Sequence, residues 1–224
     1  MNRPDADRRD DGGTGYALTL AGVAIRAGGR RLFGPLDLTV PPRSVVTVMG
    51  ASGSGKSSLL AYICGTLDPA LTGSGRVAIG DRDVTSLAPE ERRIGILFQD
   101  DLLFPHMTVG ENLAFGLPRA IRGAARRTRI DAALDAADMA GFAGRRPATL
   151  SGGQRARVAL LRTLLAEPAA LLLDEPFAKL DADLRARFRA WVFDRARQRG
   201  LPTLLVTHDP DDAAAAGGPV LTLS

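Results

Sequence analysis

The sequence predicts an α/β fold in which a parallel β-sheet is covered by helices. Three observations support this prediction. Short apolar runs alternate with helix-length segments in the second half of the chain, beginning with the run at 170–173. An apolar run at 45–49 leads directly into a glycine-rich loop and a helical segment. The run at 170–173 ends in two adjacent carboxylates, which places charged side chains at the end of a buried strand.

The N-terminal half is expected to begin with a tail and a β arm. Residues 1–15 are polar and carry both charge signs, so they are predicted to form a disordered tail. After Tyr16, apolar residues alternate up to about residue 40 and predict an N-terminal antiparallel β arm. The β-branched run Val45–Met49 suits a strand covered on both faces. Residues 101–160 are more charged, and we expect them to form a helical sub-domain.

The C-terminal third alternates helices and strands. Apolar spacing predicts helices at 151–166, 184–195 and 213–216. Between and after these helices, buried strands are predicted at 170–173, 203–207 and 219–223.

Composition excludes several classes of protein. With 224 residues, of which 45% are hydrophobic, the chain fits one globular domain rather than a disordered protein. No apolar run approaches the roughly 20 residues that span a bilayer, and no signal-peptide core is found, so we expect a cytosolic protein. The single cysteine, Cys64, suits a reducing compartment. The net charge of +4 comes from dispersed arginines, so we expect no nucleic-acid binding.

Residues 50–57 match the P-loop pattern G-x-x-x-x-G-K-[ST], between a strand and a helix. The glycines let backbone N–H groups turn inward around an anion, and the helix N-terminus adds its dipole. Lys56 is expected to reach the β- and γ-phosphates, and the Ser57 hydroxyl to bind Mg²⁺. The alternative is a Gly/Ser turn that only joins strand to helix. The predicted nucleotide-binding residues here are Gly50, Ser52, Gly53, Ser54, Gly55, Lys56, Ser57 and Ser58.

Two carboxylates, Asp174 and Glu175, follow the apolar run Leu171–Leu173. Alone, this pattern is most often an ordinary strand-end turn. Together with a P-loop, it predicts that Asp174 holds Mg²⁺ in the Walker B role and that Glu175 polarises an attacking water.

A second phosphate-binding helix start is predicted at Leu150-Ser151-Gly152-Gly153-Gln154. Its N-cap serine and two glycines direct free N–H groups at an anion. Placed between a P-loop and a Walker B motif, this segment resembles the signature of ATP-binding cassette (ABC) ATPases. The resemblance covers the chain from about residue 17, motif by motif in the family's order. It implies an ABC ATPase domain at 16–224, with a P-loop NTPase core that binds ATP and Mg²⁺.

The resemblance extends to three further residues. Gln99 resembles the Q-loop glutamine, which contacts Mg²⁺ and the attacking water. Asp181 resembles the D-loop aspartate, and His208 resembles the switch histidine that senses the γ-phosphate. The resemblance therefore implies catalytic roles for Glu175, His208 and Gln99, and metal-binding roles for Ser57, Gln99 and Asp174.

In the family, the P-loop of one subunit faces the signature of a second copy. The resemblance therefore implies a head-to-tail dimer, with ATP between the two copies. The segment 100–109 looks like the surface that docks transmembrane permease subunits, which implies a peripheral location on the cytoplasmic face of the inner membrane. The residues expected to reach the partner's nucleotide are Ser151, Gly152, Gly153, Gln154 and Asp181.

Residues 98–109, followed by Glu111 and Asn112, are similar to bacterial binding-protein-dependent importers of the thiamine, ferric-iron and polyamine type. This likeness predicts an ATPase that powers solute import, with a solute-binding protein as an indirect partner. Because the chain stops at Ser224, the regulatory C-terminal domain of longer importers is not expected. An exporter ATPase subunit and a soluble ABC ATPase remain alternatives, and the solute itself is not predicted.

One departure from the family concerns the adenine base. The family usually places an aromatic residue after the first strand to stack on adenine, but residues 24–30 contain none. We expect the planar guanidinium of Arg26 to fill part of this role, so that ATP and GTP are accepted with similar KM. The alternatives are that Tyr16 or Phe33 reaches the base.

Overall fold

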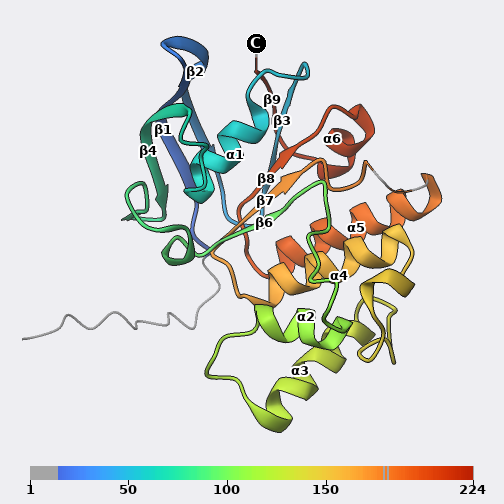
Figure 1. Ribbon diagram of the computed structural model, residues 1–224. Coiled ribbons are helices and arrows are strands. Elements are labelled where there is room, and N and C mark those ends of the chain that lie inside the picture. The colour runs from blue at the N-terminus through green and yellow to red at the C-terminus, as the bar shows by residue number, and fades with distance from the viewer. Residues whose placement is uncertain (1–14, 179, 181, 224) are drawn as a thin grey trace, which may run out of the picture.

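The computed structural model describes residues 15–178, 180 and 182–223, which fold around two β-sheets (Figure 1). The predicted tail up to residue 14 and the predicted D-loop residue Asp181 lie outside the described residues. Within the described part of the chain, no helix is both long and apolar enough to cross a membrane.

The N-terminal sheet is antiparallel, with strand order β2-β1-β4-β5. Its strands are β1 (Leu18–Ala27), β2 (Arg30–Val40), β4 (Leu71–Ile79) and β5 (Arg82–Asp83). β1 and β2 form a hairpin whose turn residues, Gly28 and Gly29, have φ angles of 50° and 84°, a region that favours glycine. The predicted antiparallel arm is confirmed, and it is wider than expected because β4 and β5 extend it.

The second sheet is parallel, with strand order β6-β7-β8-β3-β9. Its strands are β3 (Val45–Gly50), β6 (Ile94–Leu97), β7 (Ala170–Asp174), β8 (Thr203–Val206) and β9 (Val220–Leu223). Because all strands run in one direction, their carboxyl ends lie at one edge of the sheet, where ligands bind in open α/β folds. The predicted parallel sheet is confirmed, and its carboxyl edge collects the loops that follow β3, β6, β7 and β8.

Helices cover both faces of the parallel sheet (Figure 1). They are α1 (Lys56–Cys64), α4 (Gly152–Leu165), α5 (Ala182–Gln198) and α6 (Pro210–Ala216). α1 packs between the two sheets and contacts the β7 face that carries Leu172. α4 and α5 pack on the opposite face, against Leu171 and Leu173. Because side chains alternate between the two faces of the strand, they contribute to two separate apolar cores.

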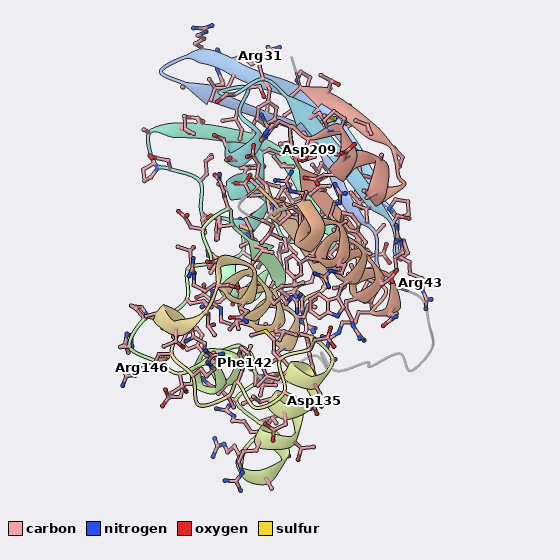
Figure 2. All side chains as sticks on the ribbon, turned by 90° about the vertical axis from the view of Figure 1, so that its right-hand side faces the viewer. Arg31, Arg43, Asp135, Phe142, Arg146 and Asp209 are labelled. Atoms are coloured by element: carbon pink, nitrogen blue, oxygen red, sulfur yellow. The ribbon has the colours of Figure 1, made fainter. Side chains whose placement is uncertain are left out.

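A third core lies under α2 (Val109–Gly116) and α3 (Gly123–Asp135), which pack against α4. Single 3₁₀ turns occur at η1 (Pro89–Glu91) and η2 (Pro147–Thr149). Figure 2 shows Asp135, on α3, at the end of the molecule opposite Arg31 on β2. The helices α2 and α3 lie within the predicted sub-domain at 101–160, whose limits stay a prediction.

The buried side chain of Arg92 anchors the far end of α1. Its guanidinium donates hydrogen bonds to the carbonyls of Tyr62 and Ile63, in the last turn of α1, and to two carbonyls of the segment 85–87. Carbonyls at a helix end lack intrahelical partners, so Arg92 satisfies them and holds the helix that begins at Lys56.

Candidate active site

The loop between β3 and α1 closes around its own lysine. The Nζ atom of Lys56 donates hydrogen bonds to the carbonyls of Gly50 and Ala51, each at 2.8 Å. The ammonium is buried, with 8% of the residue exposed, yet it lines a cavity. The lysine thus presents a positive charge at the floor of the loop, where an anion can reach it.

Glycine is required at two positions of this loop. Gly53 and Gly55 have φ angles of 82° and 90°, in the left-handed region. A Cβ atom on Gly55 would lie 2.7 Å from a ring carbon of Phe33, which packs beneath the loop. The Ser54 Oγ atom is buried with no hydrogen-bond partner among the described residues. A buried hydroxyl with no protein partner, in a glycine-rich loop before a helix, fits a phosphate ligand.

Asp174 ends β7 beside the P-loop. The Ser57 hydroxyl donates to its Oδ1 atom at 3.5 Å, and both residues line the same cavity. Burial raises the pKa of Asp174, and the charge of Glu175 raises it further, while the Ser57 hydrogen bond and Lys56 oppose both effects. The described residues hold no group of three or more His, Cys, Asp or Glu side chains that could bind a metal alone.

Glu175 and His208 meet at the ends of neighbouring strands. The Nδ1 atom of His208 lies 3.1 Å from the Oε1 atom of Glu175. The backbone of Glu175 has a φ of 45° and donates its N–H to the Val206 carbonyl at 2.9 Å, so β8 holds this turn. The His208 side chain is 67% exposed, whereas that of Glu175 is 24% exposed. A carboxylate and an imidazole therefore face the loop together.

One cavity of about 690 Å³ joins these groups. It brings together predicted residues from four loops of the carboxyl edge. They are Gly50, Ser52, Gly53, Gly55, Lys56, Ser57, Ser58, Gln99, Asp174, Glu175 and His208. The volume suits a small-molecule ligand.

The signature segment does not line this cavity. Ser151 caps α4: its Oγ atom accepts from the Gln154 N–H at 3.3 Å, and its own N–H donates to the Gln154 side chain at 3.0 Å. This capping box orders the start of α4. Ser151 and Gln154 therefore lie apart from the P-loop of the same chain, as a site that serves a second copy would require.

The structure does not bring Arg26, the residue predicted to stack on the base, to the cavity. Arg26 is exposed and donates to the Gly29 carbonyl in the hairpin turn, and it does not line the cavity. Phe33 is buried beneath the loop, and Tyr16 packs against Gly80. The residue of β2 that lines the cavity is Leu32, which the sequence reasoning missed. Its only signal was the two-residue alternation of the strand, which sets the side chains at 32 and 33 on opposite faces.

Comparisons with known sequences agree with this site. A model of the family described as "ABC transporter" matches residues 33–178. The chain is 46% identical over 198 residues to the uncharacterized ABC transporter ATP-binding protein YnjD of Escherichia coli (strain K12), covering 88% of this chain and 91% of that protein. It is 44% identical over 208 residues to the thiamine import ATP-binding protein ThiQ of Rhizobium meliloti (strain 1021), covering 92% and 85%.

A longer relative and a solved structure add to this picture. The Fe(3+) ions import ATP-binding protein FbpC of Brucella melitensis is 39% identical over 208 residues, which cover 92% of this chain and 58% of that protein. The solved dimeric structure of a post-hydrolysis state of the ATP-binding cassette MJ0796, bound to ADP and Pi, matches with a TM-score of 0.77 and 30% identity. That match covers 92% of this chain and 94% of the other.

Proposed function

The chain belongs to the ABC transporter family of ATP-binding proteins, and on this premise we propose that it is the ATPase subunit of a solute importer. As an ABC ATPase, it hydrolyses ATP to ADP and phosphate. The observation that carries the site assignment is the single cavity that Lys56, Asp174, Glu175 and His208 line together.

In this proposal, some residues of the cavity bind the phosphates and others position the attacking water and accept its proton. The P-loop amides and Lys56 hold the β- and γ-phosphates and stabilise the charge that develops between them. Glu175 orients the attacking water and accepts its proton. His208 keeps the Glu175 carboxylate in place and contacts the γ-phosphate. Gln99 reaches the same water from the loop after β6.

Ser57, Asp174 and Gln99 fit Mg²⁺ as a cofactor of this cavity, because their side chains offer oxygen donors and all three line it. When bound, Mg²⁺ would supply positive charge that neutralises part of the charge on the phosphates. The raised pKa of Asp174 agrees with such a role, because a buried carboxylate gains most from a nearby cation.

The working form in this proposal is a head-to-tail dimer. The solved relative is itself a dimeric cassette. In this chain, the capped start of α4 at Ser151 lies outside the P-loop cavity, so its helix dipole is available to a nucleotide held by a second copy. Asp181, which lies outside the described residues, is proposed for the same interface from its sequence alone.

A groove lined by residues of β6, α2, α4 and the segment 102–104 suits a helix of a permease subunit. It has a volume of about 370 Å³ and is lined by Leu102, Phe104, Phe115 and Arg162, among others. Leu102 and Phe115 are 57% and 66% exposed, which is unusual for large apolar side chains and indicates a partner surface. Docking there would place the chain on the cytoplasmic face of the membrane that holds the permease.

The groove is connected to the signature helix by two arginines of α4. The Arg162 guanidinium donates to the Leu102 carbonyl at 2.9 Å and lies 5.5 Å from the centre of the Phe104 ring. The Arg155 guanidinium pairs with the Asp101 carboxylate at 3.0 Å. Movement of a docked helix can therefore reach α4, and with it Ser151, through the segment 101–104.

Import rather than export is proposed from the names of the relatives, which include thiamine and Fe(3+) import proteins. The test is reconstitution, in lipid vesicles, of the chain with the membrane subunits encoded beside its gene, the ATPase facing outward and the solute-binding protein inside. ATP-driven release of lumenal solute is expected. ATP-driven accumulation would instead identify an exporter, and nucleic-acid-stimulated ATP hydrolysis without any membrane partner would identify a soluble ABC ATPase.

A further inference from the structure

A second cavity of about 370 Å³ lies away from the nucleotide site and is lined by residues of α3, α4, α5 and the turns that follow α4 and α5. Its apolar side is formed by Leu161, Leu164 and Leu165 of α4 together with alanines of α3. Trp191 of α5 forms another wall, and its indole N–H donates to the Ala136 carbonyl at 2.9 Å. This hydrogen bond holds the ring in place.

The charged residues around this cavity are unbalanced. Arg129, Arg195 and Arg199 line it together with one carboxylate, that of Glu167, so the lining carries a formal charge of 3 − 1 = +2. The Oε1 atom of Glu167 already accepts a hydrogen bond from the Arg129 guanidinium at 2.6 Å. Burial lowers the pKa of Arg199; the positive charges of Arg195 and Arg129 also lower it, whereas Glu167 raises it. Like charges held close together and partly out of water are unfavourable without a counter-ion.

The arginines retain donors for a ligand. In the described structure, the Arg199 guanidinium donates to the Leu164 carbonyl, which uses one of its five N–H groups. Arg195 donates to the Gln198 side chain at 3.2 Å and lies 5.9 Å from the centre of the Trp191 ring. A guanidinium fork of this kind binds phosphate and carboxylate groups through paired hydrogen bonds.

We propose that this cavity is a binding site for an organic anion with a phosphate or carboxylate group and a flat or aliphatic body. The anionic group lies between Arg195 and Arg199. The body packs against Trp191 and the exposed alanines of α3, and it covers apolar surface that a bare inorganic ion would leave in contact with water.

The site remains open when the chain is assembled with a permease in the proposed way. Arg162 and Thr163 of α4 and its C-cap residue Ala166 line the docking groove, whereas Leu161, Leu164 and Leu165 line this cavity. At 100° per residue, these two sets lie on opposite sides of the helix. An occupant would contact α3, α4 and α5 at once, and α4 is the helix that Ser151 caps.

Trp191 is the only tryptophan of the chain, so its emission reports on this cavity without a label. The experiment titrates the full chain with phenyl phosphate, which joins an anionic group to a flat body, and excites at 295 nm. Inorganic phosphate supplies the anion alone, and phenol supplies the body alone. A saturable change in emission is expected with phenyl phosphate at a concentration at least about tenfold below that needed with either fragment.

Two variants locate the effect. Gln198→Glu keeps an acceptor for Arg195 but adds a negative charge, and it should weaken phenyl phosphate binding about tenfold. Arg199→Gln should weaken it similarly. Arg127→Gln is the matched control. Arg127 lies on α3 with its side chain exposed, so this substitution removes the same charge as Arg199→Gln but outside the cavity.

Three results would overturn the proposal. The first is an unchanged Trp191 emission at saturating phenyl phosphate. The second is that Arg127→Gln and Gln198→Glu weaken phenyl phosphate binding equally. The third is a change in emission that is lost in Lys56→Ala. The last result would place the probe at the P-loop. Because the readout is the emission of Trp191 and not ATP hydrolysis or transport, failure here is distinct from failure of the proposed import function.

Discussion

The imidazole of His208 and the carboxylate of Glu175 lie within hydrogen-bonding distance, 3.1 Å between Nδ1 and Oε1. The two residues are 33 positions apart in sequence. They meet because each follows one of two neighbouring parallel strands, β7 and β8. Both residues line the P-loop cavity. In the proposed mechanism Glu175 is the base and His208 orients it, and the first prediction tests these roles.

Glu175→Gln should retain ATP binding but lower ATP hydrolysis by at least about a hundredfold, because the amide cannot accept the proton of the attacking water. It should also trap an ATP-bound dimer, which size-exclusion chromatography with ATP would detect. His208→Ala should lower turnover with a smaller loss of ATP affinity. Full activity of Glu175→Gln would remove Glu175 from the role of base.

Complementation between two inactive variants tests the composite site. Ser151→Arg should bind ATP yet fail to hydrolyse it, and Lys56→Ala should fail through its own P-loop. A heterodimer of the two variants contains one site with an intact Lys56 and an intact Ser151, so hydrolysis should return to a measurable fraction of the parent rate. Each variant alone is the control, and no recovery in a verified heterodimer would count against the head-to-tail arrangement.

Selectivity for the base should be weak. Leu32 offers an aliphatic contact and no hydrogen bond, so the parent is expected to use ATP and GTP with similar KM. Leu32→Ala should raise both KM values roughly fivefold through lost apolar contact, whereas Arg26→Ala should leave them unchanged. Steady-state hydrolysis with both nucleotides measures this, and a strong preference of the parent for ATP would show that another residue reads the base.

Cys64 should be unreactive in the folded protein. Burial raises the pKa of its thiol from its ordinary value of 9.0 to about 12, and only the thiolate is nucleophilic. A disulfide exchange reagent at pH 8 should therefore label the thiol only after denaturation. Between pH 9 and 12, the unfolded chain loses this proton while the folded chain keeps it, so this group should lower stability as pH rises. Rapid labelling of the native protein at pH 8 would contradict this expectation.

Asn112 should be essential for the shape of the permease groove. Its side chain is fully buried, accepts the Phe104 N–H at 2.8 Å and donates to the Thr108 carbonyl at 2.9 Å and the Phe104 carbonyl at 3.2 Å. Asn112→Leu leaves the Phe104 N–H unpaired, at a cost of about 1–3 kcal/mol, whereas the Phe104 and Thr108 carbonyls keep the backbone N–H groups of Met107 and Asn112 as donors. Thermal unfolding should show a Tm lower by several degrees, while the exposed control Asp131→Asn should not. An unchanged Tm for Asn112→Leu would contradict this role.

Much of the nucleotide site could be predicted because its motifs are contiguous. Gly50 to Ser58 contains a loop, a lysine and a helix start in one short segment, and Asp174 directly follows an apolar strand. Strand–helix alternation then implied a parallel sheet, whose carboxyl edge collects the residues that follow each strand. For this reason Gln99, Asp174, Glu175 and His208 line the P-loop cavity, although no local pattern links them.

Two structural features of the N-terminal half, the strand β4 and the buried side chain of Arg92, were not predicted from the sequence. β4 contains Gly73 and Gly75 among polar residues, so its sequence lacks the apolar alternation of a strand, and pairing with β1 decides its conformation. Arg92 looks like any surface arginine in the sequence. Only the packing of its segment against α1 buries it and directs its donors at the helix end.

The sequence by itself determined the chemistry of this protein, because residue types at fixed local spacing decide which groups can hold phosphate and move a proton. The tertiary structure decided which side chains share a space. It set Leu32 toward the cavity and Phe33 beneath the loop, a difference of one residue in strand register. It also gathered Arg129 of α3, Trp191 of α5 and Arg199 of the turn after α5 around a second cavity. Such juxtapositions depend on how whole elements pack, and packing arises from many distant contacts that no short stretch of sequence contains.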